Sequence, residues 1–421
     1  MKILAFFTIF NWGFFSFSGF GAQNNIDSVK SLLNISSNDT GNLGRLIYLS
    51  QEYHLAGLYD SSMFFANRAL SLSNKLLANF SDSANYSFAQ DGKASSYNNI
   101  GLAYYALGNY SLALKNHSAS LQIREKTGDK KGLAFSYNNI GNVFYAQSIY
   151  PEALKNHFLS LKIKEEVGDS GGIAASYNNI GNVYYLQNNF KEALKNYFAS
   201  LKIRQLLGKK KGIGNAYNNI GIVYDDLGNY DEALEFLFLS LKIKNEIGDK
   251  AGIGDAYNNI GSIYTKKEKF SEAIQTFYSA LKIYNEIGLR AGTASALSNI
   301  GNAFTRQKKF KEAGEYLEQA RTLAIEIGAN EYLKSTYKSI TELDSARGDY
   351  KGAYENHKLY ILYRDSMDNE ETRKKTIQSQ MTYDFEKKEA IEQAEHKKEM
   401  EKQQALAGEK SRKQKIIIAF V

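Results

Sequence analysis

The alternation of apolar and polar positions from residue 95 onward predicts two amphipathic helices joined by a short turn. Apolar or small residues first recur at the i, i+3, i+4, i+7 spacing of one helix face. They are Tyr97, Ile100, Gly101 and Tyr104. A second set with similar spacing begins at Tyr110, after the turn sequence GNY. Because GDKKG then supplies a second helix breaker, the segment is predicted to be one helix–turn–helix unit.

This unit recurs with a constant period of 40 residues. The pentapeptide YNNIG begins at positions 97, 137, 177, 217 and 257, with LSNIG at 297 and YKSIT at 337. A weaker copy occupies residues 46–72. A period in this range is typical of a solenoid, in which each unit buries its apolar face against its neighbours. The sequence therefore predicts an all-α fold with about seven repeats spanning residues 43–363.

Composition agrees with long helices packed through aromatic side chains. The 421 residues include one proline and no cysteine, but 30 tyrosines and 24 phenylalanines. Pro151 follows a turn and is predicted at the start of a second helix, where a missing N–H costs nothing. The absence of cysteine excludes disulfides and thiolate metal sites.

The repeated residues resemble the tetratricopeptide repeat signature, with tyrosine in place of the family's tryptophan. In one copy they are Tyr97, Ile100, Gly101, Tyr104 and Ala113, and four further copies fill the same places, with Phe144 in place of the second tyrosine in one of them. The resemblance implies a right-handed superhelix whose concave groove binds extended peptides or protein segments. The period exceeds the family's usual length of about 34 residues and the terminal proline is absent, which implies longer second helices.

The asparagines of YNNIG fall on the helix face opposite the apolar residues. The resemblance places that face in the concave groove, where kinesin light chain and certain bacterial peptide-sensing regulators, similar in their asparagine usage, hold extended peptides. A carboxamide can pair with both the N–H and the C=O of a peptide backbone. The predicted peptide-binding residues are Asn98, Asn99, Asn138, Asn139, Asn142, Asn178, Asn179, Asn182, Asn218, Asn219, Asn258, Asn259, Asn299 and Asn302.

Two alternatives stay open for the polar face. The amides could instead bond to one another or to neighbouring backbone and so fix the stacking of repeats. The ends of the first helices change from tyrosine (Tyr105, Tyr145, Tyr185) through Asp225 and Asp226 to basic residues such as Arg306. This gradient predicts an amphipathic or mixed-charge peptide, and its alternative is ordinary surface variation.

Catalytic and metal-binding patterns are missing from the sequence. His117, His157 and His357 share one repeat position, where other copies have Tyr197 and Leu237, so all three are predicted to be packing residues. Neither a phosphate-binding glycine loop nor a Cys/His metal spacing occurs. The sequence predicts no enzyme activity, no cofactor and no metal.

Charge does not indicate a nucleic-acid partner. The net charge of +7 and pI near 9.0 arise from 52 basic and 45 acidic residues that alternate along most of the chain. Without a concentrated basic stripe, nucleic acid is not predicted as a partner.

The two ends differ from the repeats. Residues 1–22 read as a signal peptide or an N-terminal anchor, which predicts an exported protein, periplasmic or attached to the membrane. Residues 364–415 are predicted to form a long charged helix or linker. Its partial apolar seam indicates a dimer contact or a lever, and the alternative is a solvated spacer. Residues 416–421 resemble the start of a truncated transmembrane helix, which would place a membrane at the C-terminus, although the preceding basic cluster runs against the positive-inside tendency.

Three functions are consistent with these features. This order of segments resembles the sensor half of bacterial membrane proteins whose output is a histidine kinase, a cyclase or a DNA-binding domain, so the first is a peptide-binding sensor. The second is a freestanding envelope scaffold. The third is an intracellular, peptide-responsive regulator.

Overall fold

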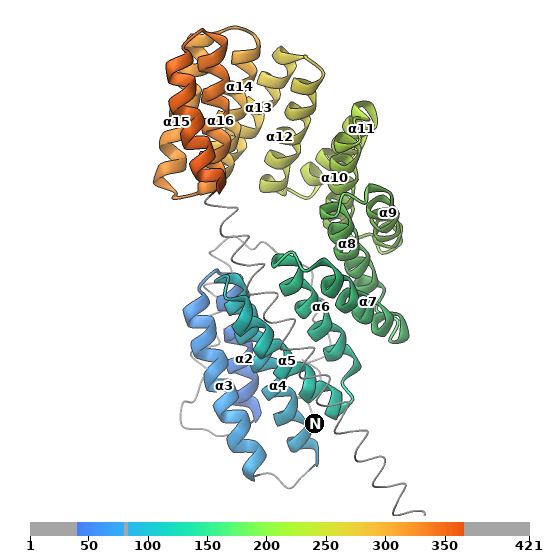
Figure 1. Cartoon of the computed structure of the whole chain (residues 1–421). Helices are drawn as coiled ribbons and strands as arrows, with labels where there is room; N and C mark the ends of the chain where they lie inside the picture. Colours follow the sequence, from blue (N-terminus) through green and yellow to red (C-terminus); the bar gives the residue numbers. More distant parts are fainter. Residues whose placement is uncertain (1–39, 80–82, 366–421) are drawn as a thin grey trace, which may run out of the picture. The chain divides into compact units, whose positions relative to one another are not determined.

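The computed structural model describes residues 40–79 and 83–365, and every regular element in these ranges is an α-helix (Figure 1). The chain divides between Ile247 and Gly248 into two compact units. The first unit contains α2 (Thr40–Leu55), α3 (Tyr59–Asn79), α4 (Ser83–Ala106), α5 (Tyr110–Thr127), α6 (Lys130–Ala146), α7 (Tyr150–Glu166), α8 (Ser170–Leu186), α9 (Phe190–Leu206), α10 (Lys210–Asp226) and α11 (Tyr230–Glu246). The second contains α12 (Lys250–Lys266), α13 (Phe270–Glu286), α14 (Arg290–Arg306), α15 (Phe310–Glu326) and α16 (Asn330–Ala346), followed by helical residues 350–365.

Within each unit, helix pairs are arranged in tandem and each helix packs against the next one in the chain. The first helices of the 40-residue repeats are α4, α6, α8, α10, α12, α14 and α16, and each is followed by its second helix. This confirms the predicted all-helical, solenoid-like fold. From α6 to α9 all four helices have 17 residues, so the second helix is not longer than the first. The weak copy predicted at residues 46–72 corresponds to α2 and α3.

Glycine at the predicted signature position lets the two helices of a repeat approach closely. A Cβ atom on Gly181 would lie 2.7 Å from the Tyr197 ring, and one on Gly221 would lie 2.8 Å from Leu237. Ile180 and Ile220 are fully buried beside these glycines. The Ile–Gly pair of YNNIG therefore builds the interface between the first and second helix of a repeat.

Three histidines share the second-helix position that faces the signature glycine, and the prediction that they are packing residues is confirmed for two of them and wrong for the third. His117 and His157 are each 1% exposed and lie against Gly101 and Gly141, which confirms their packing role. His357 is exposed, so the prediction is wrong there. The residue opposite it in the repeat pattern is Thr341, which leaves no glycine gap for the ring.

We expect Gly181→Ala to lower the free energy of unfolding by about 1–3 kcal/mol, because the new methyl group overlaps a buried aromatic ring. Gly171→Ala is the matched control in the same helix, since its nearest neighbouring atom would be 3.7 Å away. The control should be neutral or stabilise the protein by up to about 1 kcal/mol through helix propensity. Urea unfolding of both variants measures the difference, and equal stabilities would contradict the close-packing role.

Helix ends follow the breakers seen in the sequence. Gly168 closes α7 with φ of 71°, a conformation that suits glycine. The following Asp169 accepts a hydrogen bond from the Gly172 backbone N–H at 2.9 Å and so caps α8. Pro151 lies in the first turn of α7, as predicted.

The predicted end segments, residues 1–22 and 416–421, lie outside the described residues, as does the charged segment from residue 366. Among the helices of residues 40–79 and 83–365, none has both the length and the apolar character needed to cross a bilayer.

Candidate functional site

The asparagine pairs lie on the first helices, on the side away from the buried Ile–Gly pair. In α8, Ile180 and Gly181 are buried while Asn178 and Asn179 are partly exposed. The same register holds in α6, α10 and α12. The pairs are therefore half-buried, which means that neighbouring repeats restrict their side chains.

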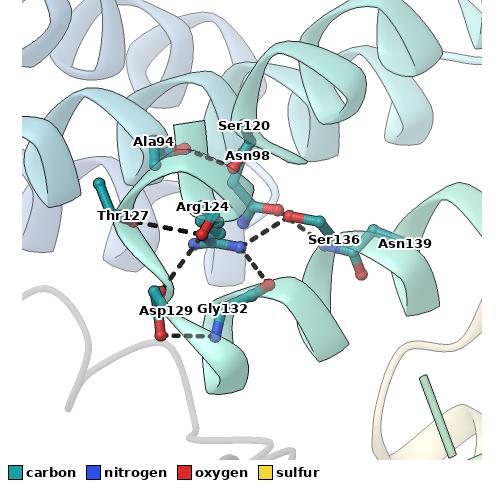
Figure 2. A network of polar contacts seen from close by, with 9 residues as sticks. All are labelled: Ala94, Asn98, Ser120, Arg124, Thr127, Asp129, Gly132, Ser136 and Asn139. Atoms are coloured by element: carbon teal, nitrogen blue, oxygen red, sulfur yellow. Dashed lines mark hydrogen bonds and ion pairs between the residues drawn. The ribbon is translucent and has the colours of Figure 1, made fainter. Parts of the chain in front are cut away.

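Amide–amide hydrogen bonds join the asparagines of consecutive repeats. In each bond, Nδ2 of the second asparagine of one repeat donates to Oδ1 of the first asparagine of the preceding repeat. The bonds are Asn139 to Asn98 at 2.8 Å (Figure 2), Asn179 to Asn138 at 3.0 Å, Asn219 to Asn178 at 3.3 Å and Asn299 to Asn258 at 2.8 Å. The alternative prediction, that these amides bond to one another, is confirmed for these four pairs.

The bonds leave the first asparagines with an unused donor group. The Oδ1 atoms of Asn98, Asn138 and Asn178 accept the inter-repeat bonds, whereas their Nδ2 groups donate to none of the described residues. Asn258 differs, because its Nδ2 lies 3.5 Å from Ser295 Oγ. Since each Nδ2 carries two hydrogens, three consecutive repeats present amide donors with capacity for a further partner.

A row of tyrosines follows the first asparagines on the same helix face. Tyr105, Tyr145 and Tyr185 come seven residues after Asn98, Asn138 and Asn178, two helical turns along. We call these six residues the asparagine face.

The tyrosine hydroxyls lie close enough to influence one another. Burial raises the pKa of Tyr145, and the neighbouring Tyr150 and Tyr105 raise it further. The pKa of Tyr185 is raised by burial and by the hydrogen bond that its hydroxyl donates to Asp226 at 2.7 Å. These phenols are therefore neutral at physiological pH and can donate or accept hydrogen bonds.

Other predicted site residues have different surroundings. Asn99 is only 3% exposed and donates to the backbone carbonyl of Ile47 in α2 at 3.4 Å, so its side chain is covered in this structure. The packing of α2 on α4 covers it. Asn182 accepts a hydrogen bond from the Tyr197 hydroxyl at 2.8 Å. Asn302 donates to Glu342 at 3.0 Å.

The remaining predicted asparagines are partly exposed. Asn142 lies one turn after Asn138 on α6 and bonds to none of the described residues. Asn218 and Asn259 are half-buried in α10 and α12. For all fourteen asparagines, peptide binding itself stays a prediction.

A set of buried basic side chains near the asparagine bonds was not predicted from the sequence. Arg124 in α5 is 8% exposed, and its Nη1 donates to the Gly132 carbonyl at 2.8 Å and to Ser136 Oγ at 2.9 Å, both in α6 (Figure 2). Asp129 lies 3.7 Å from Arg124 Nε. The guanidinium therefore joins the second helix of one repeat to the first helix of the next.

Lysine takes the same place one repeat later. Lys164 Nζ donates to Ser176 Oγ at 2.9 Å. Burial lowers the pKa of Lys164 to about 8, against the opposing effect of Asp169. Basic residues recur at this place with the 40-residue period, and that periodicity is the signal that could have revealed them. They are Arg124, Lys164, Arg204 and Lys244.

We expect Lys164→Met to keep or raise the free energy of unfolding at pH 7, by up to about 3 kcal/mol, because it removes a buried charge and keeps the apolar stem. The folded-state pKa lies below the unfolded value of 10.5, so the wild type gains stability as pH rises from about 8 to 10.5. The advantage of the methionine variant should therefore shrink over that window. Thermal melts at pH 7 and pH 10 measure it, and a large loss at pH 7 would contradict a burial penalty.

Tandem helical hairpins define a helical-repeat protein. Within the described ranges, no cluster of three or more His, Asp or Glu side chains is placed to hold a metal ion. The tetratricopeptide repeat family profile matches residues 92–166, 172–246, 212–286 and 252–326, which together cover more than half of the sequence. The chain belongs to the tetratricopeptide repeat family.

Solved structures share this fold at low sequence identity. The apo quorum sensor NprR from B. thuringiensis aligns with a TM-score of 0.59 and 14% identity, over 82% of this chain and 97% of that one. A Rap protein complexed with competence and sporulation factor aligns with a TM-score of 0.57 and 15% identity, over 83% and 95%. A signal transduction ATPase with a tetratricopeptide repeat sensor from Pyrococcus horikoshii gives 0.56 and 14%, over 85% and 55%. No curated protein sequence matches the chain.

Proposed function

We propose that the protein is a non-enzymatic module that binds an extended peptide or protein segment on the asparagine face. The observation that carries this proposal is the set of unused Nδ2 donors on Asn98, Asn138 and Asn178. They recur once per repeat on successive first helices, in fixed orientation, because each Oδ1 is held by the following repeat. Regularly spaced, pre-oriented donors suit a regularly spaced acceptor.

The backbone of an extended peptide is such an acceptor. Packed helices lie about 8–10 Å apart, and an extended chain advances about 3.3–3.6 Å per residue. Successive asparagines would therefore be about two to three peptide residues apart, close to the two-residue spacing of carbonyls that point to one side of an extended chain. Because backbone carbonyls are common to all sequences, the amides supply affinity, and the tyrosine row with Asp226 supplies selectivity for side chains.

The similar structures support a peptide ligand. One of them is a Rap protein in complex with competence and sporulation factor, and another is a quorum sensor. Their likeness to this chain concerns the fold, so the ligand class proposed here rests on the donors described above.

We further propose that the module is the exported sensor part of a membrane signalling protein. The apolar segment at residues 1–22 and the basic and apolar residues at the C-terminal end support this proposal. A freestanding envelope scaffold and an intracellular peptide-responsive regulator are the alternatives, and the quorum-sensor likeness favours the latter. A periplasmic reporter fused after residue 100 should be active, and an inactive fusion would favour the intracellular regulator.

A selection from a random peptide library tests the ligand class. We expect enriched peptides to bind in extended form and to lose affinity when single backbone carbonyls on the bound side are weakened as acceptors by ester substitution. Side-chain substitutions at the same residues serve as the control. Failure to enrich any peptide, or enrichment of peptides whose backbone can be altered freely, would contradict backbone recognition.

A further inference from the structure

The outer side of α9 combines exposed apolar and basic side chains. Phe198, Lys202 and Leu206 follow one another at intervals of four residues, and Phe198 is 38% and Leu206 81% exposed. Between residues 193 and 224 the sequence contains six basic residues and no acidic residue. This stretch is the exception to the mixed charge of the chain.

The neighbouring second helices continue the pattern. Phe158 in α7 and Phe238 in α11 are 43% and 46% exposed, and each is followed four residues later by a lysine, Lys162 and Lys242. The Phe198 ring packs against Phe236 of α11 with 5.8 Å between ring centres, so the outer sides of α9 and α11 adjoin. We call Phe158, Phe198, Leu206 and Phe238, with Lys155, Lys162, Lys202, Lys209 and Lys242, the outer aromatic face.

Two departures from the repeat pattern concentrate positive charge at α9. Lys209 precedes α10, where Asp129, Asp169 and Asp249 precede the equivalent helices of other repeats. Leu206 occupies the position at which Glu166 and Glu246 pair with Lys130 and Lys210. Each departure removes an acidic group, and one of them leaves a leucine in its place.

Three of the five lysines of this face have no ion-pair partner, whereas Lys162 and Lys242 interact electrostatically with Glu166 and Glu246. Lys155, Lys202 and Lys209 have no acidic partner at ion-pair distance among the described residues. Lys195, beside them, pairs with Glu192 at 3.2 Å. The face therefore combines positive charge with apolar groups that project into solvent from second helices, which do not carry the asparagine face.

We propose that the outer aromatic face binds the surface of an anionic lipid bilayer. Aromatic and leucine side chains enter the boundary between headgroups and acyl chains, while lysines on flexible stems reach the anionic headgroups. Projecting side chains in a row suit a planar lipid surface better than a partner that needs a pocket. This binding would leave the asparagine face free for its ligand, and it does not depend on the proposed peptide function.

An environment-sensitive fluorophore tests the proposal, because the chain lacks cysteine and accepts a single labelled one. Gln205→Cys places an NBD label on the exposed side of α9 beside Leu206, and Asn188→Cys places it in the exposed turn before the other end of the helix. The full chain is mixed with vesicles of phosphatidylcholine and phosphatidylglycerol, or of phosphatidylcholine alone. Since each label reports its own surroundings, the result is independent of how other segments meet the vesicle.

We expect the label at residue 205 to rise roughly twofold or more in emission with anionic vesicles, and the label at 188 to stay unchanged. The rise should disappear when Phe158, Phe198 and Phe238 are replaced by serine. It should persist when three exposed apolar residues elsewhere, Leu58, Phe64 and Leu107, are replaced by serine. Circular dichroism confirms that each variant folds.

Three results would overturn the proposal. In the first, the emission of the label at 205 does not change with anionic vesicles. In the second, it rises equally when the three phenylalanines are replaced by serine. In the third, it rises with a synthetic acidic amphipathic peptide and not with vesicles. The third result would reassign the face to an acidic protein partner.

Discussion

The free energy of unfolding is expected to fall by several kcal/mol between pH 7 and pH 4, because two buried histidines resist protonation in the folded protein. Burial, aided by Arg124, lowers the pKa of His117 to about 3. Burial, aided by Lys164, lowers the pKa of His157 to about 4. In the unfolded chain both titrate near the ordinary value of about 6.5. The unfolded state therefore binds more protons over this range, and acid favours it.

The direction and window of the effect follow from these values. The part of the free energy of unfolding that depends on these two histidines is fully present above pH 6.5. It declines as the pH falls below 6.5 and reaches its lower limit near pH 3–4. Each pKa unit corresponds to about 1.4 kcal/mol, so each histidine accounts for roughly 2–4 kcal/mol. Neither Nδ1 atom has a hydrogen-bond partner among the described residues, which leaves the charged ring without compensation.

The repeats themselves supply the control variant. Tyr197 and Leu237 occupy the same place and pack against glycine in the same way. The double variant His117→Leu, His157→Tyr should fold, match the wild type at pH 7 within about 1–2 kcal/mol, and lose most of the acid dependence. Urea unfolding from pH 7 to pH 4 measures this. An unchanged acid slope in the double variant would show that carboxylates, not these histidines, govern acid unfolding.

Peptide affinity is expected to fall by about 10- to 100-fold in the double variant Asn138→Ala, Asn178→Ala, because two ligand-facing donors are lost at about 0.5–1.5 kcal/mol each. The double variant Asn139→Ala, Asn179→Ala is the matched control. Both variants break two of the amide bonds between repeats, so both should lose a similar 1–3 kcal/mol or so of unfolding free energy.

Only the ligand affinities should distinguish the two variants. The second double variant keeps the Nδ2 groups of Asn98, Asn138 and Asn178 but releases the Oδ1 atoms of Asn98 and Asn138, so it should lose less affinity for a library-selected peptide than the first, no more than a few-fold. Isothermal titration calorimetry measures both. Equal losses of affinity would mean that the amide pairs act through repeat stacking alone.

The sequence predicted the repeat architecture well because its determinants are local and periodic. Gly181 and Ile180 recur with their partners at fixed spacing, so one copy explains the others. The different hydrogen-bonding roles of the first and second asparagine of each pair could not be predicted from the sequence of one helix. It depends on a contact between residues 41 positions apart, such as Asn138 and Asn179, whose direction is set by the packing of two repeats.

The burial of the basic residues and the exposure of His357 could not be predicted from the sequence, for the same reason. Arg124 looks like a surface residue in a charged segment until the next repeat covers it. His357 shares the repeat position of His157, but Thr341 removes the space that the ring would fill. In both cases the environment is made by a different helix, which residue type alone does not specify.

The side-chain amide signals of the asparagines test the central claim most directly. In a nitrogen-15 NMR titration with a library-selected peptide, the Nδ2 signals of Asn98, Asn138 and Asn178 should shift together and saturate with the peptide affinity. Those of Asn139 and Asn179, already donating within the protein, should shift less. A saturating peptide that leaves the signals of Asn98, Asn138 and Asn178 unchanged would contradict peptide binding on the asparagine face.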